Sequence, residues 1–209
     1  MSTHDSKRPF RLYLITDGTL MPNLEEACEA ALAGGVRAIQ LREKDLPVRE
    51  LLSLAKGLRK LTAGFGARLF INDRVDVALA SGADGVHLGV NSIPPGAVRK
   101  IAGEKLMIGA STHNIEEARR AERSGADFIT FGPVYETPSK MKYGNPVGIK
   151  KLSEAARELS IPIFALGGIK RDNMEEALGA GAYGIALISG IFGQKNIKAQ
   201  AEKFMRMLK

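Results

Sequence analysis

The chain repeats one local pattern four times, and this repetition constrains its fold more than any other feature. In each copy a glycine between two small residues precedes a short apolar run. The copies are Ala33–Gly35 before VRAIQL, Ser81–Ala83 before DGVHL, Ser124–Ala126 before DFITF and Ala180–Ala182 before YGIALI. Each glycine follows a stretch with helical periodicity. We therefore expect the glycine to end a helix and the apolar run to form a strand.

The spacing of the repeats predicts further strands between them. The glycines at 34, 82, 125 and 181 are 48, 43 and 56 residues apart, too long for one strand–helix unit and right for two. Four more apolar runs fill the gaps, at 12–16, 68–72, 106–110 and 161–166. Eight apolar strands alternating with helices indicate a parallel sheet covered by helices. The sequence thus predicts one compact (βα)₈ TIM barrel over residues 1–209, with 1–9 as a flexible N-terminal tail.

Three helix starts carry the sequence of a capping box, in which an Asn or Asp precedes a Glu by three residues. These are Asn23 with Glu26, Asn114 with Glu117, and Asp172 with Glu175. In such a box the first side chain accepts a hydrogen bond from an otherwise unpaired backbone N–H. We expect all three to begin helices.

Composition narrows the class of protein. The single cysteine excludes an internal disulfide framework, and no apolar run approaches the roughly 20 residues that a membrane span needs. Met1–Arg8 is polar and does not resemble a secretory signal, so a cytoplasmic location is expected. The net charge of +7 is spread along the chain, which is more typical of a site for anions than of a nucleic-acid interface. Neither nucleic acid nor membrane is expected as a partner, and a homo-oligomer stays open.

Polar residues follow the expected strands at the end where TIM barrels hold their active sites. Gln40, Arg42 and Lys44 alternate with Leu41 and Glu43, so an extended chain would turn all three the same way. Two cations at a barrel mouth favour an anion, and a planar guanidinium beside an ammonium suits pyrophosphate. A surface-exposed strand end is the alternative.

Other strand ends carry polar residues as well. Asp73 could cap the next helix, or hold Mg²⁺ beside a pyrophosphate. His87 lies within an alternating strand and could simply line the barrel, whereas His113 lies beyond a strand, where contact with a substrate is expected. Gly167–Gly168 could be a tight turn. Together with Ser189–Gly190 after the last strand, it favours a phosphate site.

These segments together resemble the thiamine phosphate synthase family. The motifs are LYLITD (12–17), QLREK (40–44), IND (71–73), GVHLG (85–89), GASTH (109–113), GPVYETPSK (132–140), ALGGI (165–169) and IALISGI (185–191). They run in order across essentially the whole chain. The resemblance implies a (βα)₈ transferase that joins hydroxymethylpyrimidine pyrophosphate to a thiazole phosphate. The implied reaction is dissociative, and pyrophosphate is released with Mg²⁺ as cofactor.

The resemblance also implies a role for particular residues. The pyrimidine pyrophosphate would be bound by Gln40, Arg42, Lys44, Asn72, Ser111 and Lys140, of which Arg42, Lys44, Ser111 and Lys140 would be catalytic. The thiazole phosphate would be bound by Thr137, Ser139, Gly168, Ile188 and Ser189. Asp73 would bind Mg²⁺.

The chain departs from the family pattern at one position. Ser92 stands where the family usually has a second acidic Mg²⁺ ligand, so the free protein is expected to bind the ion weakly. Two alternatives follow. One is an isomerase like the thiazole tautomerases, a sister family that Glu136, Thr137 and His113 resemble, with His113 as general acid and base. The other is a catalytically silent regulatory barrel.

Overall fold

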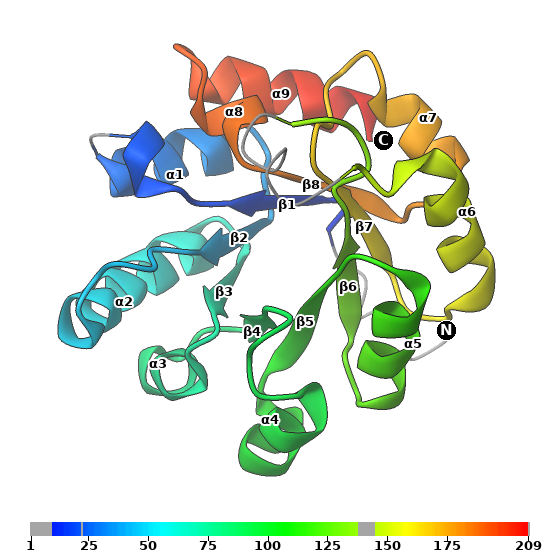
Figure 1. The fold of residues 1–209 in the computed structure, drawn as a ribbon. Helices are drawn as coiled ribbons and strands as arrows, with labels where there is room; N and C mark the ends of the chain where they lie inside the picture. Colours follow the sequence, from blue (N-terminus) through cyan, green and yellow to red (C-terminus); the bar gives the residue numbers. More distant parts are fainter. Residues whose placement is uncertain (1–9, 22, 138–144, 209) are drawn as a thin grey trace, which may run out of the picture.

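The computed structural model describes residues 10–21, 23–137 and 145–208. Eight parallel strands form a closed barrel in which each strand pairs with the next along the chain and β8 pairs with β1 (Figure 1). The strands are β1 (Leu12–Ile15), β2 (Ala38–Leu41), β3 (Arg68–Asn72), β4 (Gly85–Leu88), β5 (Met107–Thr112), β6 (Phe128–Phe131), β7 (Ile163–Leu166) and β8 (Gly184–Leu187). All eight expected strands and the TIM-barrel fold are confirmed. The expected tail, residues 1–9, lies outside the described residues.

Helices surround the strands as an outer ring (Figure 1). They are α1 (Leu24–Ala33), α2 (Val48–Gly64), α3 (Val75–Ser81), α4 (Pro95–Ala102), α5 (Ile115–Arg123), α6 (Gly148–Glu158), α7 (Met174–Gly179), α8 (Ser189–Phe192) and α9 (Ile197–Met207). The repeated glycines end helices as expected. Gly34 is the C-cap of α1 with a φ of −79°, and the glycine after it, Gly35, has a positive φ, as Gly82, Gly125 and Gly181 do, between 69° and 103°. Glycine adopts this conformation without the steric cost that other residues incur.

Two of the three expected capping boxes are present. Asn23 accepts a hydrogen bond from the backbone N–H of Glu26, and Asn114 accepts one from that of Glu117. The prediction at Asp172 is wrong, because α7 begins one residue later with Asn173 as its N-cap. The Asn173 side chain instead accepts from Lys170 N–H, at 2.7 Å, and so closes the turn that precedes the helix.

The strands separate two apolar cores. The larger core lies between the sheet and the helices, and the smaller one fills the barrel with aromatic rings from Phe10, Tyr13, Phe70, Phe128 and Phe164. Neighbouring rings in this cluster lie 5.2–6.0 Å apart, in stacked, tilted and edge-to-face arrangements. Such arrangements are those that aromatic pairs prefer.

Each inward phenylalanine of the sheet pairs with a glycine on a neighbouring strand. Phe70 pairs with Gly85, Phe128 with Gly109, and Phe164 with Gly184. A Cβ at Gly85 would lie 2.5 Å from the Phe70 ring, and one at Gly109 would lie 2.5 Å from the Phe128 ring. The glycines therefore provide the space that the rings occupy.

We expect Gly85→Ala to destabilise the barrel by about 1–3 kcal/mol, because overpacking a well-filled core forces shifts of backbone or side chains. Urea unfolding followed by circular dichroism measures the change. Gly64→Ala is the matched control, since a Cβ there meets nothing within 4 Å and lies in a helix, where alanine is favoured. Equal unfolding midpoints for the two variants would contradict the packing argument.

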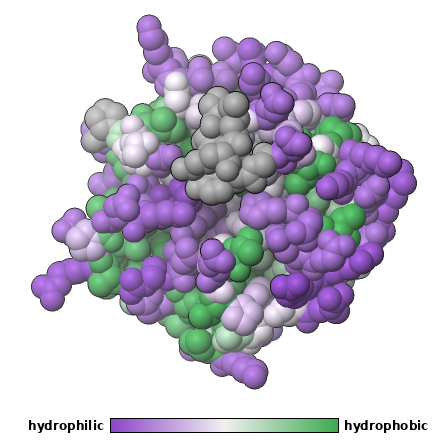
Figure 2. Space-filling model, viewed as in Figure 1, coloured by the Kyte–Doolittle hydropathy of each residue, from purple (hydrophilic) through white to green (hydrophobic). Residues whose placement is uncertain are grey.

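None of the described helices combines the length and apolar character that a bilayer span requires. Figure 2 shows a largely hydrophilic face, with hydrophobic residues in separate groups.

Cys28 is buried, and its burial raises the pKa of the thiol to about 12, so it stays protonated. Its role is packing.

Candidate active site at the carboxyl ends of the strands

The end of β2 brings an amide and two cations to the barrel mouth. Gln40 is the last inward residue of the strand and is only 2% exposed, Arg42 is half-buried, and Lys44 is exposed. The expected alternation does not continue to Lys44, because the strand ends at Leu41 and Lys44 lies in a turn. The expected shared orientation of Gln40, Arg42 and Lys44 therefore stays a prediction.

A line of hydrogen bonds joins β2 to β3 across the mouth. Gln40 Nε2 donates to Asn72 Oδ1 at 2.9 Å, and Asn72 Nδ2 donates to Asp73 Oδ2 at 2.8 Å. Gln40 Oε1 is buried and has no hydrogen-bond partner among the described residues. An unpaired buried acceptor costs about 1–3 kcal/mol, so this oxygen is suited to a ligand that brings a donor.

Asp73 points toward the loop after β4. Its Oδ1 accepts hydrogen bonds from the backbone N–H of Gly89, at 3.0 Å, and from the hydroxyl of Ser92. Its φ of 60° is the only positive value among the described non-glycine residues. The alternative that Asp73 caps the next helix is wrong, because α3 begins at Val75 with Arg74 as its N-cap.

The position of Ser92 bears on metal binding. The residue lies beside Asp73, at the position where the resemblance implies a second acidic Mg²⁺ ligand. It offers a hydroxyl rather than a second carboxylate. Within residues 10–21, 23–137 and 145–208, no three His, Cys, Asp or Glu side chains gather in a way that could hold a metal ion. The contact between Asp73 and Ser92 thus offers one carboxylate and one hydroxyl.

Thr16 and Glu43 fasten the loops after β1 and β2 together, which the sequence did not indicate. The Thr16 hydroxyl donates to Glu43 Oε1 at 2.6 Å and accepts from the backbone N–H of Arg42 at 2.8 Å. Glu43 Oε2 accepts from Gly18 N–H at 3.0 Å. Both capacities of a fully buried hydroxyl are used, and the pair fixes the backbone from which Arg42 projects.

We expect Thr16→Val to destabilise the fold by about 1–3 kcal/mol, because valine leaves Glu43 and the Arg42 N–H without their buried partner. Thr16→Ser is the control, since it keeps the hydroxyl. Urea unfolding of the three proteins measures the difference. A valine variant as stable as the wild type would contradict the assigned role of the hydroxyl.

His87 lies inside the barrel, which confirms the prediction that it lines the barrel. It is 2% exposed, and its ring contacts three hydroxyl groups: Tyr13 at 3.3 Å from Nδ1, and Ser111 at 3.1 Å and Thr130 at 3.4 Å from Nε2. Burial lowers the pKa of this imidazole to about 4, against a smaller opposing effect of the Asp73 charge. His87 is therefore neutral at neutral pH. Its link to Ser111 was not foreseen.

The loops after β6 and β7 fit together on another side of the mouth. Val134 N–H donates to Leu166 O at 2.8 Å, and Tyr135 N–H donates to Gly167 O at 3.0 Å. Gly168 has a φ of 66°, and a Cβ there would lie 2.6 Å from the carbonyl oxygen of Glu136. The loop that contains Thr137 therefore packs directly on Gly168.

Two further residues expected at the thiazole phosphate, Ile188 and Ser189, lie at the end of β8. Ile188 follows β8 as the N-cap of α8, and Ser189 is the first residue of that short helix. Ser139 and Lys140 lie outside the described residues.

His113 connects β5 to β6 at the mouth. Its Nδ1–H donates to the carbonyl of Gly132, and its backbone N–H donates to Glu117 Oε2 at 2.7 Å. The imidazole is therefore oriented by the loop after β6.

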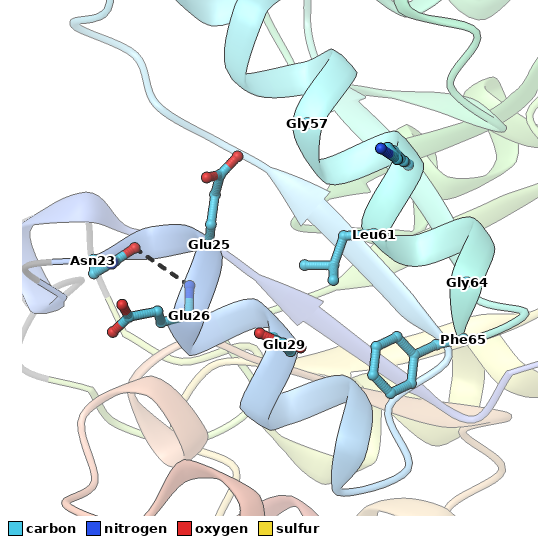
Figure 3. A pocket seen from close by; sticks show the side chains of 9 residues that line it. Asn23, Glu25, Glu26, Glu29, Gly57, Leu61, Gly64 and Phe65 are labelled. Carbon is cyan, nitrogen blue, oxygen red and sulfur yellow. Dashed lines mark hydrogen bonds between the residues drawn. The ribbon is translucent and has the colours of Figure 1, made fainter.

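A groove on the outside of the barrel differs from the mouth in position and chemistry. It lies between α1 and α2, has a volume of about 590 Å³, and is lined by Asn23, Glu25, Glu26, Glu29, Gly57, Lys60, Leu61, Gly64 and Phe65 (Figure 3). The Asn23 side chain there is engaged in capping α1. None of the residues expected at the site lines this groove.

A closed (βα)₈ barrel with polar groups at the carboxyl ends of its strands defines the class, that of TIM-barrel proteins with a polar site at this face. The family model of thiamine monophosphate synthase matches residues 12–191. A relative from Geobacter sulfurreducens is 54% identical over 205 residues, which cover 97% of this chain and 96% of that protein. The thiamine-phosphate synthase of Halalkalibacterium halodurans is 46% identical, with 96% of each chain covered.

A solved structure agrees with these matches. The thiamine phosphate pyrophosphorylase of Pyrococcus furiosus has a TM-score of 0.90 to this chain, with 38% identity and 97% of each chain covered. The chain belongs to the thiamine monophosphate synthase family. The family and transferase class expected from the sequence are confirmed.

Proposed function

We propose that the protein is a thiamine-phosphate synthase that joins hydroxymethylpyrimidine pyrophosphate to a thiazole phosphate and releases pyrophosphate. The observation that carries the substrate assignment is the buried Oε1 of Gln40, which has no partner among the described residues and lies two positions before the cation Arg42. An aminopyrimidine brings an N–H donor for that oxygen, and its pyrophosphate brings negative charge for the cations. One substrate thus supplies both the hydrogen-bond donor for Gln40 and the negative charge for the cations.

The proposed reaction is dissociative. The bond between the pyrimidine methylene carbon and the pyrophosphate oxygen breaks, and its electron pair leaves with the oxygen. The resonance-stabilised pyrimidine cation then accepts the lone pair of the thiazole nitrogen. Arg42, Lys44 and Lys140 stabilise the charge that develops on the leaving group, and Ser111 donates to it. No side chain is needed as a covalent nucleophile.

Mg²⁺ fits the mouth only with help from the substrate. Asp73 supplies one carboxylate, and Mg²⁺ commonly combines one or two carboxylates with phosphate oxygens and water. Asp73 would hold the ion together with the pyrophosphate, and the ion would supply positive charge to the leaving group. Weak binding to the free protein, and joint binding with the substrate, follow from the hydroxyl at Ser92.

The thiazole phosphate is assigned to the opposite group of loops, at Thr137, Ser139, Gly168, Ile188 and Ser189. Support comes from the packing of the Thr137 loop against Gly168 and from the short helix that begins at Ser189. Holding the nucleophile close to the cation lowers the entropic cost of the bimolecular step. The isomerase and regulatory alternatives give no use to the cations at 42 and 44.

The direct test is a coupling assay of the purified protein with both substrates. Thiamine phosphate and pyrophosphate should form in equal amounts, only with both substrates present, and faster with Mg²⁺. Omission of either substrate is the control. Absence of coupling at every Mg²⁺ concentration would refute the proposal.

Arg42→Ala should lower kcat/KM for the pyrimidine substrate by about 10- to 150-fold. This range corresponds to the loss of one charge-assisted hydrogen bond, about 1.5–3 kcal/mol. Arg49→Ala is the matched control, because Arg49 is an exposed cation on α2 nearby in sequence. If both variants keep the wild-type kcat/KM, Arg42 does not contact the substrate.

Ser92→Asp should lower the Mg²⁺ concentration for half-maximal rate by about tenfold, the scale on which changes around a ligand alter metal affinity. Ser92→Asn is the control, because asparagine has the shape of aspartate without its negative charge. Asp73→Ala should abolish coupling. The reaction rate of each of the three variants is measured as a function of Mg²⁺ concentration. Full activity of Asp73→Ala would show that Asp73 is not a Mg²⁺ ligand.

A cytoplasmic location, the absence of nucleic-acid and membrane partners, and self-association stay predictions from the sequence.

A further inference from the structure

Three polar groups, two of them buried, form a path from the aromatic interior of the barrel to its mouth. The Tyr13 hydroxyl lies 3.3 Å from His87 Nδ1, and His87 Nε2 lies 3.1 Å from Ser111 Oγ. Tyr13 and His87 are 0% and 2% exposed, whereas Ser111 is partly exposed. The three residues come from β1, β4 and β5, so only the closed barrel brings them together.

The surroundings of Tyr13 set the direction of its hydrogen bond. Rings of Phe10, Phe70, Phe128 and Phe164 lie 5.3–6.0 Å from the Tyr13 ring. Among the described residues, His87 Nδ1 is the hydroxyl's only hydrogen-bond partner. If Nδ1 carried the proton, the Tyr13 O–H would be left without an acceptor, which is costly for a buried group. Tyr13 therefore donates, and Nδ1 accepts.

The state of Nδ1 decides the state of Nε2. A neutral imidazole has one proton, and with Nδ1 acting as acceptor that proton is on Nε2. Nε2–H then donates to Ser111 Oγ, and Thr130 Oγ1, at 3.4 Å, is a more distant second acceptor. Ser111 Oγ receives a hydrogen bond from below, while its own O–H has no acceptor among the described residues. That hydrogen is available to the mouth.

We infer that Tyr13 and His87 are positioning residues, which act through Ser111 by fixing its hydroxyl as a hydrogen-bond donor to the pyrophosphate of the substrate. This inference rests on the proposed function. In the opposite tautomer Ser111 would donate to Nε2 and turn lone pairs toward an anion, which repels them. The orientation thus matches a negatively charged substrate group, and the aromatic rings around Tyr13 set it.

The first test reads the tautomer without any activity. Nitrogen-15 NMR of the uniformly labelled free protein should show His87 with a proton on Nε2 and none on Nδ1. The chain has three histidines, so the signals that vanish in His87→Gln identify the residue. A proton on Nδ1 would overturn the inference.

The second test is a double-mutant cycle on kcat. Tyr13→Phe keeps the ring and removes only the oxygen, and should lower kcat about fivefold, the effect of one neutral hydrogen bond. In a Ser111→Ala background the same change should alter kcat by less than about twofold, because Tyr13 acts through the missing hydroxyl. An equal loss in both backgrounds would mean a structural role and overturn the inference.

A matched pair of substitutions at His87 separates its two nitrogens. Glutamine places an amide nitrogen near the position of Nε2 and can still donate to Ser111, whereas asparagine reaches only the position of Nδ1. We expect His87→Gln to recover most of the kcat that His87→Asn loses, while KM for the thiazole substrate stays the same in both. Equal kcat values would contradict the assigned role.

The two proposals fail in different ways. Failure of the synthase assignment would appear as no coupling by a wild-type protein whose His87 has the proton on Nε2. Failure of the present inference would appear as an active enzyme with the proton on Nδ1, or with equal losses in the cycle.

Discussion

The pairing of inward phenylalanines with glycines on neighbouring strands is the constraint on which the rest of the structure depends. Phe70, Phe128 and Phe164 fill the barrel because Gly85, Gly109 and Gly184 leave room beside them. A barrel of eight strands has an interior just wide enough for side chains to fill. Large and small residues must therefore alternate around the ring, and the sequence supplies that alternation in the strands themselves.

The aromatic filling also determines what lies above it. Tyr13 belongs to the aromatic cluster by its ring and to the polar layer by its hydroxyl, which contacts His87. Above this point the inward positions become polar, with Gln40, Asn72 and Ser111 at the mouth. The dry interior fixes the hydrogen-bond directions of the layer above, since buried groups can pair only with one another.

Two elements of the site follow from contacts between neighbouring loops. Thr16 and Glu43 join the loops after β1 and β2, and Asp73 receives hydrogen bonds from the loop after β4. In both cases one loop is held by the next one around the ring. This arrangement suits the proposed binding of two anionic substrates, because donors and cations held in place stabilise developing charge without reorganisation.

The sequence by itself determined the eight strands, the glycines that end helices and the polar strand ends, because each depends on local periodicity, backbone conformation or chain order. It did not determine the orientation of Asp73, the Thr16–Glu43 contact or the path from Tyr13 to Ser111. Those depend on residues far apart in the chain that meet only when β8 pairs with β1 and closes the barrel. The capping signal at Asp172 failed for a local reason, because the turn that Asn173 closes with Lys170 moves the start of α7 by one residue.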